Sequence, residues 1–108
     1  ILGDAIQPAP GMPKSGHMAN QHGKVAANAI VSILSGQAYT QEPVVANTCY
    51  SFIDDKSVVH VSSVHRYMPA KKTMEIVPGS GGLSPGPSEL EGQYAFAWAR
   101  NIWSDTLG

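Results

Sequence analysis

The spacing of apolar residues changes midway along the chain, and this change constrains the fold more than any other feature of the sequence. Between Ser15 and Gly36 the apolar residues recur at the spacing of a helix, namely Met18, Val25, Ala26, Ala29, Ile30, Ile33 and Leu34. Ser15 can cap the start of such a helix, and Gly36 can end it. From Cys49 onward the pattern has the period of two that is typical of strands. The sequence therefore predicts a long helix followed by a β-region.

The β-region divides into three segments, which we expect to be strands, at residues 49–53, 57–67 and 72–77. Only three residues separate the first two, and the next connection contains Pro69, so neighbouring strands should pair antiparallel as a meander. A loop rich in Gly and Pro follows at residues 78–87. Ser88 and Glu91 then form a capping-box pattern, which predicts a last helix through about Ser104. Its apolar side should include Leu90, Tyr94, Ala97, Trp98 and Ile102. The expected class is α+β.

The start of the chain indicates a turn that leads into the first helix. Ile1 and Leu2 are expected to end a core strand, and Gly3-Asp4 would form the turn after it. Three prolines exclude regular structure from residues 5–13. A helix that begins near Lys14-Ser15-Gly16 offers free N–H groups and a positive dipole end, which attract negative charge. We expect a ligand with anionic character there.

Composition excludes several broad classes. Hydrophobic residues make up 43% of the 108 residues and charged residues 14%, which favours a packed globular domain over disorder. The formal net charge is -1 and the basic residues are scattered, so no stripe exists that could neutralise nucleic-acid phosphates. No apolar run approaches the roughly 20 residues that a membrane-spanning helix needs. We therefore expect neither nucleic-acid binding nor a membrane span.

Metal and hydrolase chemistry find little support. His17 and His22 lie five apart on a helix and His60 and His65 five apart on a strand, so neither pair shares a face. No HExxH pattern and no G-x-S-x-G elbow occurs. Cys49 is the single cysteine, so any disulfide would need a residue outside this chain. From the residues alone, Cys49 is either a small buried apolar group or a reactive thiol.

Three stretches, "GDAIQPAPGMPKSGHMANQHGKVAANAI", "NTCYSFI" and "HRYM", resemble the flavoprotein subunit of flavocytochrome c sulfide dehydrogenase. The similarity covers the whole chain and corresponds to the C-terminal part of that subunit. It implies that residues 1–40 are the last strand, loop and helix of an FAD-binding fold with two dinucleotide-binding domains. Residues 41–108 would be a small C-terminal domain, a three-stranded antiparallel sheet with a terminal helix, that packs over the flavin.

The resemblance also implies site residues, a cofactor and partners. Cys49 would be catalytic, as half of a redox-active disulfide with a cysteine from outside this chain. The residues implied to contact FAD are Gly3, Asp4, Ala5, Lys14, Ser15, Gly16 and Trp103. Most of the FAD site would lie upstream, because no G-x-G-x-x-G occurs here, and the fragment alone would be inactive. Sulfide would be oxidised to sulfur or polysulfide in the periplasm, and electrons would pass to a c-type cytochrome subunit that carries haem c.

Two alternatives stay open. A sulfide:quinone oxidoreductase uses the same disulfide and flavin but commonly carries an amphipathic C-terminal anchor, which "SELEGQYAFAWARNIWSDTLG" does not resemble because it has few basic residues. The other alternative is a non-catalytic interface domain that mediates dimerisation in a flavoprotein related to the disulfide reductases. In that case Cys49 would serve only in packing. Of the two tryptophans, five residues apart, we expect Trp98 to be the one that packs in the core.

Overall fold

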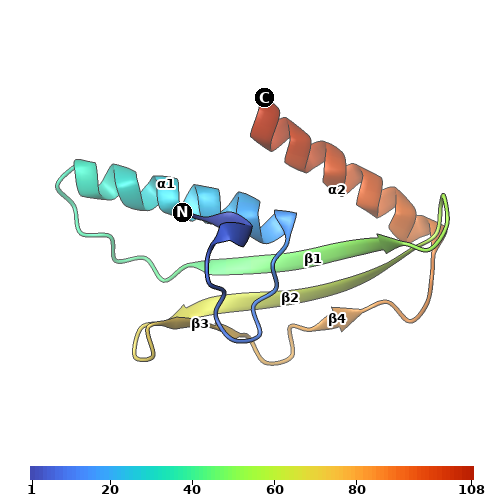
Figure 1. Ribbon diagram of the computed structural model, residues 1–108, viewed down its shortest axis with the longest axis horizontal. Helices are drawn as coiled ribbons and strands as arrows, with labels where there is room; N and C mark the ends of the chain where they lie inside the picture. Colours follow the sequence, from blue (N-terminus) through green and yellow to red (C-terminus); the bar gives the residue numbers. More distant parts are fainter.

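The computed structural model describes all 108 residues as two long helices beside one antiparallel sheet (Figure 1). In chain order the elements are the short 3-10 helix η1 (Gly3–Ala5), α1 (Gly16–Leu34), β1 (Val44–Phe52), β2 (Val58–Met68), β3 (Thr73–Ile76), β4 (Gly82–Leu83) and α2 (Glu89–Leu107). The predicted α+β class is confirmed, with the sheet and the terminal helix where the sequence placed them. Neither helix is both long and apolar enough to cross a membrane.

The first helix begins and ends close to where its sequence signals predict. Ser15 is the N-cap, and its hydroxyl accepts a hydrogen bond from the Met18 N–H at 3.2 Å. After the C-cap Ser35, Gly36 takes the left-handed conformation with φ of 73°, which glycine adopts at little cost. The N-terminal half of α1 packs against the rest of the chain. Ile30, Ile33 and Leu34, near its C-terminus, are exposed.

The sheet is organised around β2, the longest strand. β1 pairs antiparallel with one side of β2, with Cys49 opposite Val61, while β3 and β4 both pair with the other side. β1 begins at Val44, five residues before the predicted start at Cys49. The sequence did not predict β4, because a two-residue strand inside a Gly/Pro-rich loop carries no periodic signal. β1 is consequently an edge strand, open to whatever lies beside it.

The last helix is held close to the sheet by small residues. Gly92 and Ala95 are buried, and a Cβ at Gly92 would overlap the carbonyl oxygen of Lys56. Val58, on the adjoining part of β2, is completely buried. We expected Leu90 and Tyr94 on the packed side of this helix, and that assignment is wrong because both are exposed. Helical spacing selects the large apolar residues, whereas this helix packs on the sheet through the small residues Gly92 and Ala95.

The predicted strand end at Ile1 and Leu2 is not observed. Leu2 has extended dihedral angles, but none of the sheet's strands lies beside it as a partner, and Gly3 opens η1 instead. The following loop crosses the sheet (Figure 1) and delivers Met12 to a small core with Met18 and Val45. This core fixes the start of α1 against β1, and so it positions the residues described next.

Candidate functional site

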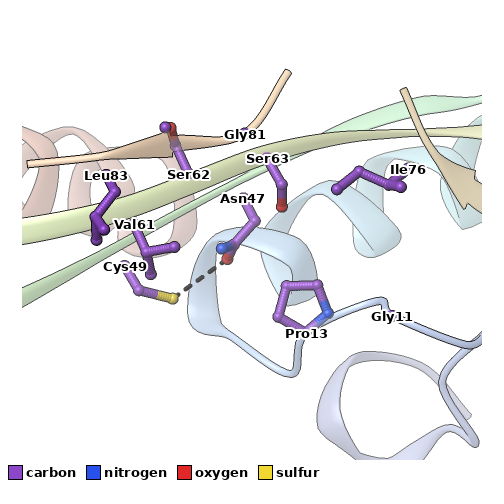
Figure 2. Close-up of a pocket in the computed structure, with 11 residues that line it drawn as sticks. Gly11, Pro13, Asn47, Cys49, Val61, Ser62, Ser63, Ile76, Gly81 and Leu83 are labelled. Atoms are coloured by element: carbon purple, nitrogen blue, oxygen red, sulfur yellow. Dashed lines mark hydrogen bonds between the residues drawn. The ribbon is translucent and has the colours of Figure 1, made fainter. Parts of the chain in front are cut away.

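Cys49 lies on β1 between two clefts. The first, which we call the sheet cleft, has a volume of about 480 Å³ and is bordered by Asn47, Cys49, Val61, Ser63, Ile76 and Leu83, with the loop at Gly11 and Pro13 across from them (Figure 2). No charged side chain lines it. Figure 2 shows the Cys49 sulfur directed toward the Asn47 amide on the same face of the strand.

The second cleft, the helix cleft, has a volume of about 410 Å³ and lies between the start of α1, β1 and α2. Five of the eight residues that the resemblance implied meet around it, namely Lys14, Ser15, Gly16, Cys49 and Trp103. Trp103 is 62% exposed and Trp98 is half-buried. Of the two tryptophans, Trp98 is therefore the one that packs inward, as expected. Residues distant in sequence therefore form one concave surface of the size that small ligands use.

The remaining three implied residues form η1, outside the lining of this cleft. Gly3 is buried with φ of 67°, and a Cβ there would lie 3.2 Å from the Cβ of Ala19, so η1 sits tightly on α1. The Lys14 ammonium donates to the main-chain oxygen of Asp4 at 2.9 Å. Asp4 therefore bonds to a residue that lines the helix cleft, but neither Asp4 nor Ala5 lines the cleft itself.

The start of α1 presents unsatisfied donors. The N–H groups of Gly16 and His17 have no acceptor in the chain, as expected for the first turn of a helix whose cap hydroxyl takes only the Met18 N–H. No acidic residue occupies this turn. With Lys14 adjacent, the positive end of the helix dipole is uncompensated. The arrangement favours an anionic or electron-rich ligand edge at this position.

The free edge of β1 adds main-chain groups to the same cleft. Gln21 covers this edge at Ala46, since its amide donates to the Ala46 oxygen at 2.5 Å and accepts from the Ala46 N–H at 2.8 Å. Along an antiparallel edge strand every second residue points its N–H and C=O the same way. Thr48 and Tyr50 therefore face the helix cleft with main-chain groups that bond to no other element. Periodicity alone could not identify these groups.

Aromatic rings form the opposite wall of the helix cleft. Trp98 contacts His17 edge-on with ring centroids 5.9 Å apart, and Tyr50 with centroids 6.0 Å apart. The nitrogens His17 Nδ1 and Trp98 Nε1 are buried without a hydrogen-bond partner. Burial lowers the pKa of His17, so it is neutral at pH 7. The aromatic side chains of Tyr50, Trp98 and Trp103 along this cleft provide apolar surface suited to a flat ring system such as a flavin.

Sequence reasoning missed Asn47, the residue that connects Cys49 to α1. Its Oδ1 accepts a hydrogen bond from the Cys49 thiol at 3.3 Å and another from the Ser15 hydroxyl at 2.7 Å. Asn47 is 2% exposed. The available signal was its position two residues before Cys49, which places both side chains on one face of the strand.

A separate polar cluster lies where β2, β4 and α2 meet. The Ser84 hydroxyl donates to Glu91 Oε2 at 2.5 Å and lies 2.8 Å from His60 Nδ1, which is 3.1 Å from the same carboxylate oxygen. The hydrogen bond from Ser84 and the contact with His60 lower the pKa of Glu91. The cluster thus joins three elements of the fold. Nowhere in the chain do three or more His, Cys, Asp or Glu side chains form a group that could hold a metal ion.

A comparison with protein families agrees with this geometry. The family model described as "Flavocytochrome c sulphide dehydrogenase, flavin-binding" matches residues 41–107, more than half of the chain. The matched segment contains β1 with Cys49, the whole sheet and α2 with Trp103. The flavin and the enzyme class that the resemblance implied are therefore supported at the level of the family. The chain belongs to the family of the flavin-binding domain of flavocytochrome c sulphide dehydrogenase.

Proposed function

We propose that this chain takes part in sulfide oxidation, with Cys49 as the residue that reacts with sulfide and FAD bound along the helix cleft. The observation that carries the proposal is the meeting of Lys14, Gly16, Cys49 and Trp103 around that one cleft. The helix N-terminus would meet the electron-rich pyrimidine edge of the ring, and the exposed Trp103 would cover part of its surface. Gly3, Asp4 and Ala5 would support the ribityl and phosphate portion from η1.

The proposed chemistry starts from a disulfide between Cys49 and a second cysteine supplied from outside this chain. Hydrosulfide attacks the Cys49 sulfur, the S–S bond breaks, and the products are a persulfide on Cys49 and a thiolate on the other cysteine. FAD, when bound, supplies a two-electron acceptor that regenerates the oxidised state. The uncharged sheet cleft leaves space beside Cys49 for the soft, polarisable sulfur that results.

The same proposal includes the context of the domain. Residues 1–40 would be the C-terminal segment of the FAD-binding domain and residues 41–108 the small domain that covers the flavin. Ile30, Ile33 and Leu34, exposed on α1, would pack against the remainder of the flavoprotein subunit. Electrons would pass to a c-type cytochrome subunit with haem c in the periplasm, and the exposed Trp103 would lie on the side of the flavin that faces this partner.

The test is the Cys49→Ser variant of the flavin-loaded protein. It should keep its bound flavin, because Cys49 contributes one small side chain to the helix cleft, and it should lose sulfide-dependent flavin reduction by at least about 1,000-fold, as expected when a nucleophilic centre is removed. Flavin content is read from the visible absorbance, and reduction from its bleaching under anaerobic sulfide. Ser51→Ala, two residues along the same face and exposed, is the matched control and should reduce normally.

Retained sulfide-dependent reduction in Cys49→Ser would contradict the catalytic role and favour the interface-domain alternative. Loss of flavin together with activity would instead show that Cys49 serves in packing. In the unmodified protein, sulfide-dependent reduction of a quinone without reduction of cytochrome c would favour the sulfide:quinone oxidoreductase.

A further inference from the structure

Ser63 directs its hydroxyl into the sheet cleft from β2. In the register of β1 and β2 it lies opposite Asn47, whereas Cys49 lies opposite Val61. Figure 2 shows the Ser63 oxygen and the Cys49 sulfur on the same side of the sheet, while the Ser62 side chain points to the other side. The Ser63 hydroxyl therefore shares the sheet cleft with the residue that we propose to react with sulfide.

The spacing between Cys49 and Ser63 leaves room for one added sulfur atom. Residues placed diagonally across an antiparallel pair have Cα atoms about 7–8 Å apart, and no hydrogen bond joins these two side chains directly. The Cys49 sulfur leans along β1 toward Asn47, which is level with Ser63, and contacts Asn47 Oδ1 at 3.3 Å. A second sulfur bonded to Cys49 adds about 2.05 Å to its reach. Such a sulfur can approach the Ser63 hydroxyl to hydrogen-bonding distance.

His65 fixes the Ser63 hydroxyl from the interior of the domain. Its Nε2 lies 2.9 Å from the Ser63 oxygen, and the whole residue is buried. Burial lowers the pKa of His65, so the ring is neutral at pH 7 and carries a single N–H. The Nδ1 atom is buried without a hydrogen-bond partner. A proton on Nδ1 would bury the only N–H of the ring without an acceptor, so we assign the proton to Nε2.

This assignment leaves the Ser63 proton available to a ligand. Nε2–H of His65 donates to the Ser63 oxygen, and no acceptor in the chain takes the hydroxyl proton. No charged side chain lines the sheet cleft, so an anion inside it depends on neutral donors. Asn47 Oδ1, level with Ser63, is an acceptor that Cys49 and Ser15 already occupy. The Ser63 O–H is suited to hydrosulfide, which is an anion, because hydrogen bonds to charged groups are the stronger ones.

We propose that Ser63 is a sulfide-binding residue whose hydroxyl donates a hydrogen bond to the sulfur that reacts at Cys49, and that His65 is its positioning residue. The hydrosulfide sulfur bonds to Cys49 as the disulfide bond breaks, and the second cysteine leaves with the electron pair as a thiolate. Ser63 keeps its proton throughout, and its hydrogen bond remains on the added sulfur. The inference rests on the proposed function, because it names a residue that receives the substrate of that reaction.

The test measures sulfide-dependent flavin reduction in the flavin-loaded protein over a range of sulfide concentrations. Ser63→Ala should lower kcat/KM for sulfide at least about tenfold, because a hydrogen bond to a charged group is lost. Ser63→Thr keeps the hydroxyl on a residue that strands accommodate well, and it should restore kcat/KM. Ser62→Ala is the matched control, since it removes a neighbouring hydroxyl from the other side of the sheet, and it should leave kcat/KM unchanged.

An unchanged kcat/KM in Ser63→Ala would overturn the inference. An equal loss in Ser62→Ala would also overturn it, because the effect would then not depend on the face of the sheet. Normal reduction in Ser63→Ala together with none in Cys49→Ser would refute this inference alone. Normal reduction in Cys49→Ser would refute the proposed function, and the inference with it.

A second measurement needs neither a variant nor sulfide, so it holds even if Ser63→Ala does not fold. The unmodified, flavin-loaded protein is labelled with ¹⁵N at histidine, and nuclear magnetic resonance reports which ring nitrogen of His65 carries the proton. We expect the proton on Nε2 and none on Nδ1. A proton on Nδ1 would overturn the inference, because Ser63 would then donate to His65 and not to the sulfur.

Discussion

The two long helices have the same length and the same kind of N-cap, yet their first turns differ in charge and in what they contact. Each has 19 residues, and each begins after a serine whose hydroxyl accepts from an N–H three residues on, Met18 in α1 and Glu91 in α2. The first turn of α2 contains Glu89 and Glu91, whereas that of α1 contains no acid. The dipole of α2 is thus compensated by acidic side chains of its own first turn, whereas the first turn of α1 supplies no such compensation.

The contrast extends to what each helix start touches. Glu91 is part of the Ser84 and His60 cluster, and Ser88 exchanges main-chain hydrogen bonds with Val58, so the start of α2 is fully engaged in holding the fold. Ser15 instead contacts Asn47 and lies beside the helix cleft. One helix start stabilises the domain, and the other borders the helix cleft.

The largest expected effect is on stability and comes from Gly92. In Gly92→Ala the new methyl group overlaps the Lys56 carbonyl oxygen, a main-chain atom that cannot move without displacing α2. We expect a loss of about 3 kcal/mol in the free energy of unfolding, measured by thermal or denaturant unfolding. Gly23→Ala in α1 is the matched control, because nothing lies within 4 Å of a Cβ there, and it should gain about 0.5–1 kcal/mol. Equal changes in stability for Gly92→Ala and Gly23→Ala would contradict the conclusion that close packing at the start of α2 holds the fold.

Acid should weaken the two helix starts in separate pH ranges. Burial lowers the pKa of His17 and of His65 below 6.5, so their neutral forms favour the folded state above pH 6.5 and this contribution is lost as the pH falls below that value. The pKa of Glu91 is lowered below 4.5, so its contribution persists to more acid conditions and is lost only below pH 4.5.

Amide hydrogen exchange at pH 7.5, 5.5 and 4 would report each helix separately. Protection in the first half of α1 should fall between pH 7.5 and 5.5, while that at the start of α2 should hold until below pH 4.5. His17→Gln with His65→Gln should remove most of the first change. Simultaneous loss in both helices would mean that the two ends do not differ.

A smaller effect is expected on the flavin. Lys14→Glu places a negative charge at the open end of α1, which should oppose the charge of the reduced ring and lower the two-electron potential by about 10–40 mV. Glu89, exposed in the first turn of α2, provides the control, since Glu89→Lys should leave the potential unchanged. An unchanged potential in Lys14→Glu would show that the lysine does not face the ring.

The sequence predicted the elements well where one physical signal dominates. Ser15 and Ser88 are caps as expected, and the helices and the three main strands follow from apolar spacing. The predicted capping box is only half formed, because the Ser88 N–H bonds to Val58 and the Glu91 carboxylate to Ser84. Such choices between partners depend on contacts made after folding, and a linear pattern does not contain them.

The candidate site was also predictable only in part. Lys14, Ser15, Gly16, Cys49 and Trp103 were implied by resemblance, and the fold brings them to one cleft. Their roles toward FAD and sulfide stay predictions. Asn47 and the free edge at Thr48 escaped notice, since their meaning comes from an edge strand and a helix start that meet only in three dimensions.

The central claim is that sulfide reacts at Cys49, and mapping the transferred sulfur tests it most directly. The oxidised, flavin-loaded protein is given one equivalent of sulfide, blocked with an alkylating agent and digested with trypsin, so that Cys49 lies in the peptide of residues 25–56. We expect this peptide to carry the mass of one additional sulfur atom between the cysteine and the alkyl group. An unmodified Cys49 peptide, with flavin reduced by the same sulfide, would contradict the claim.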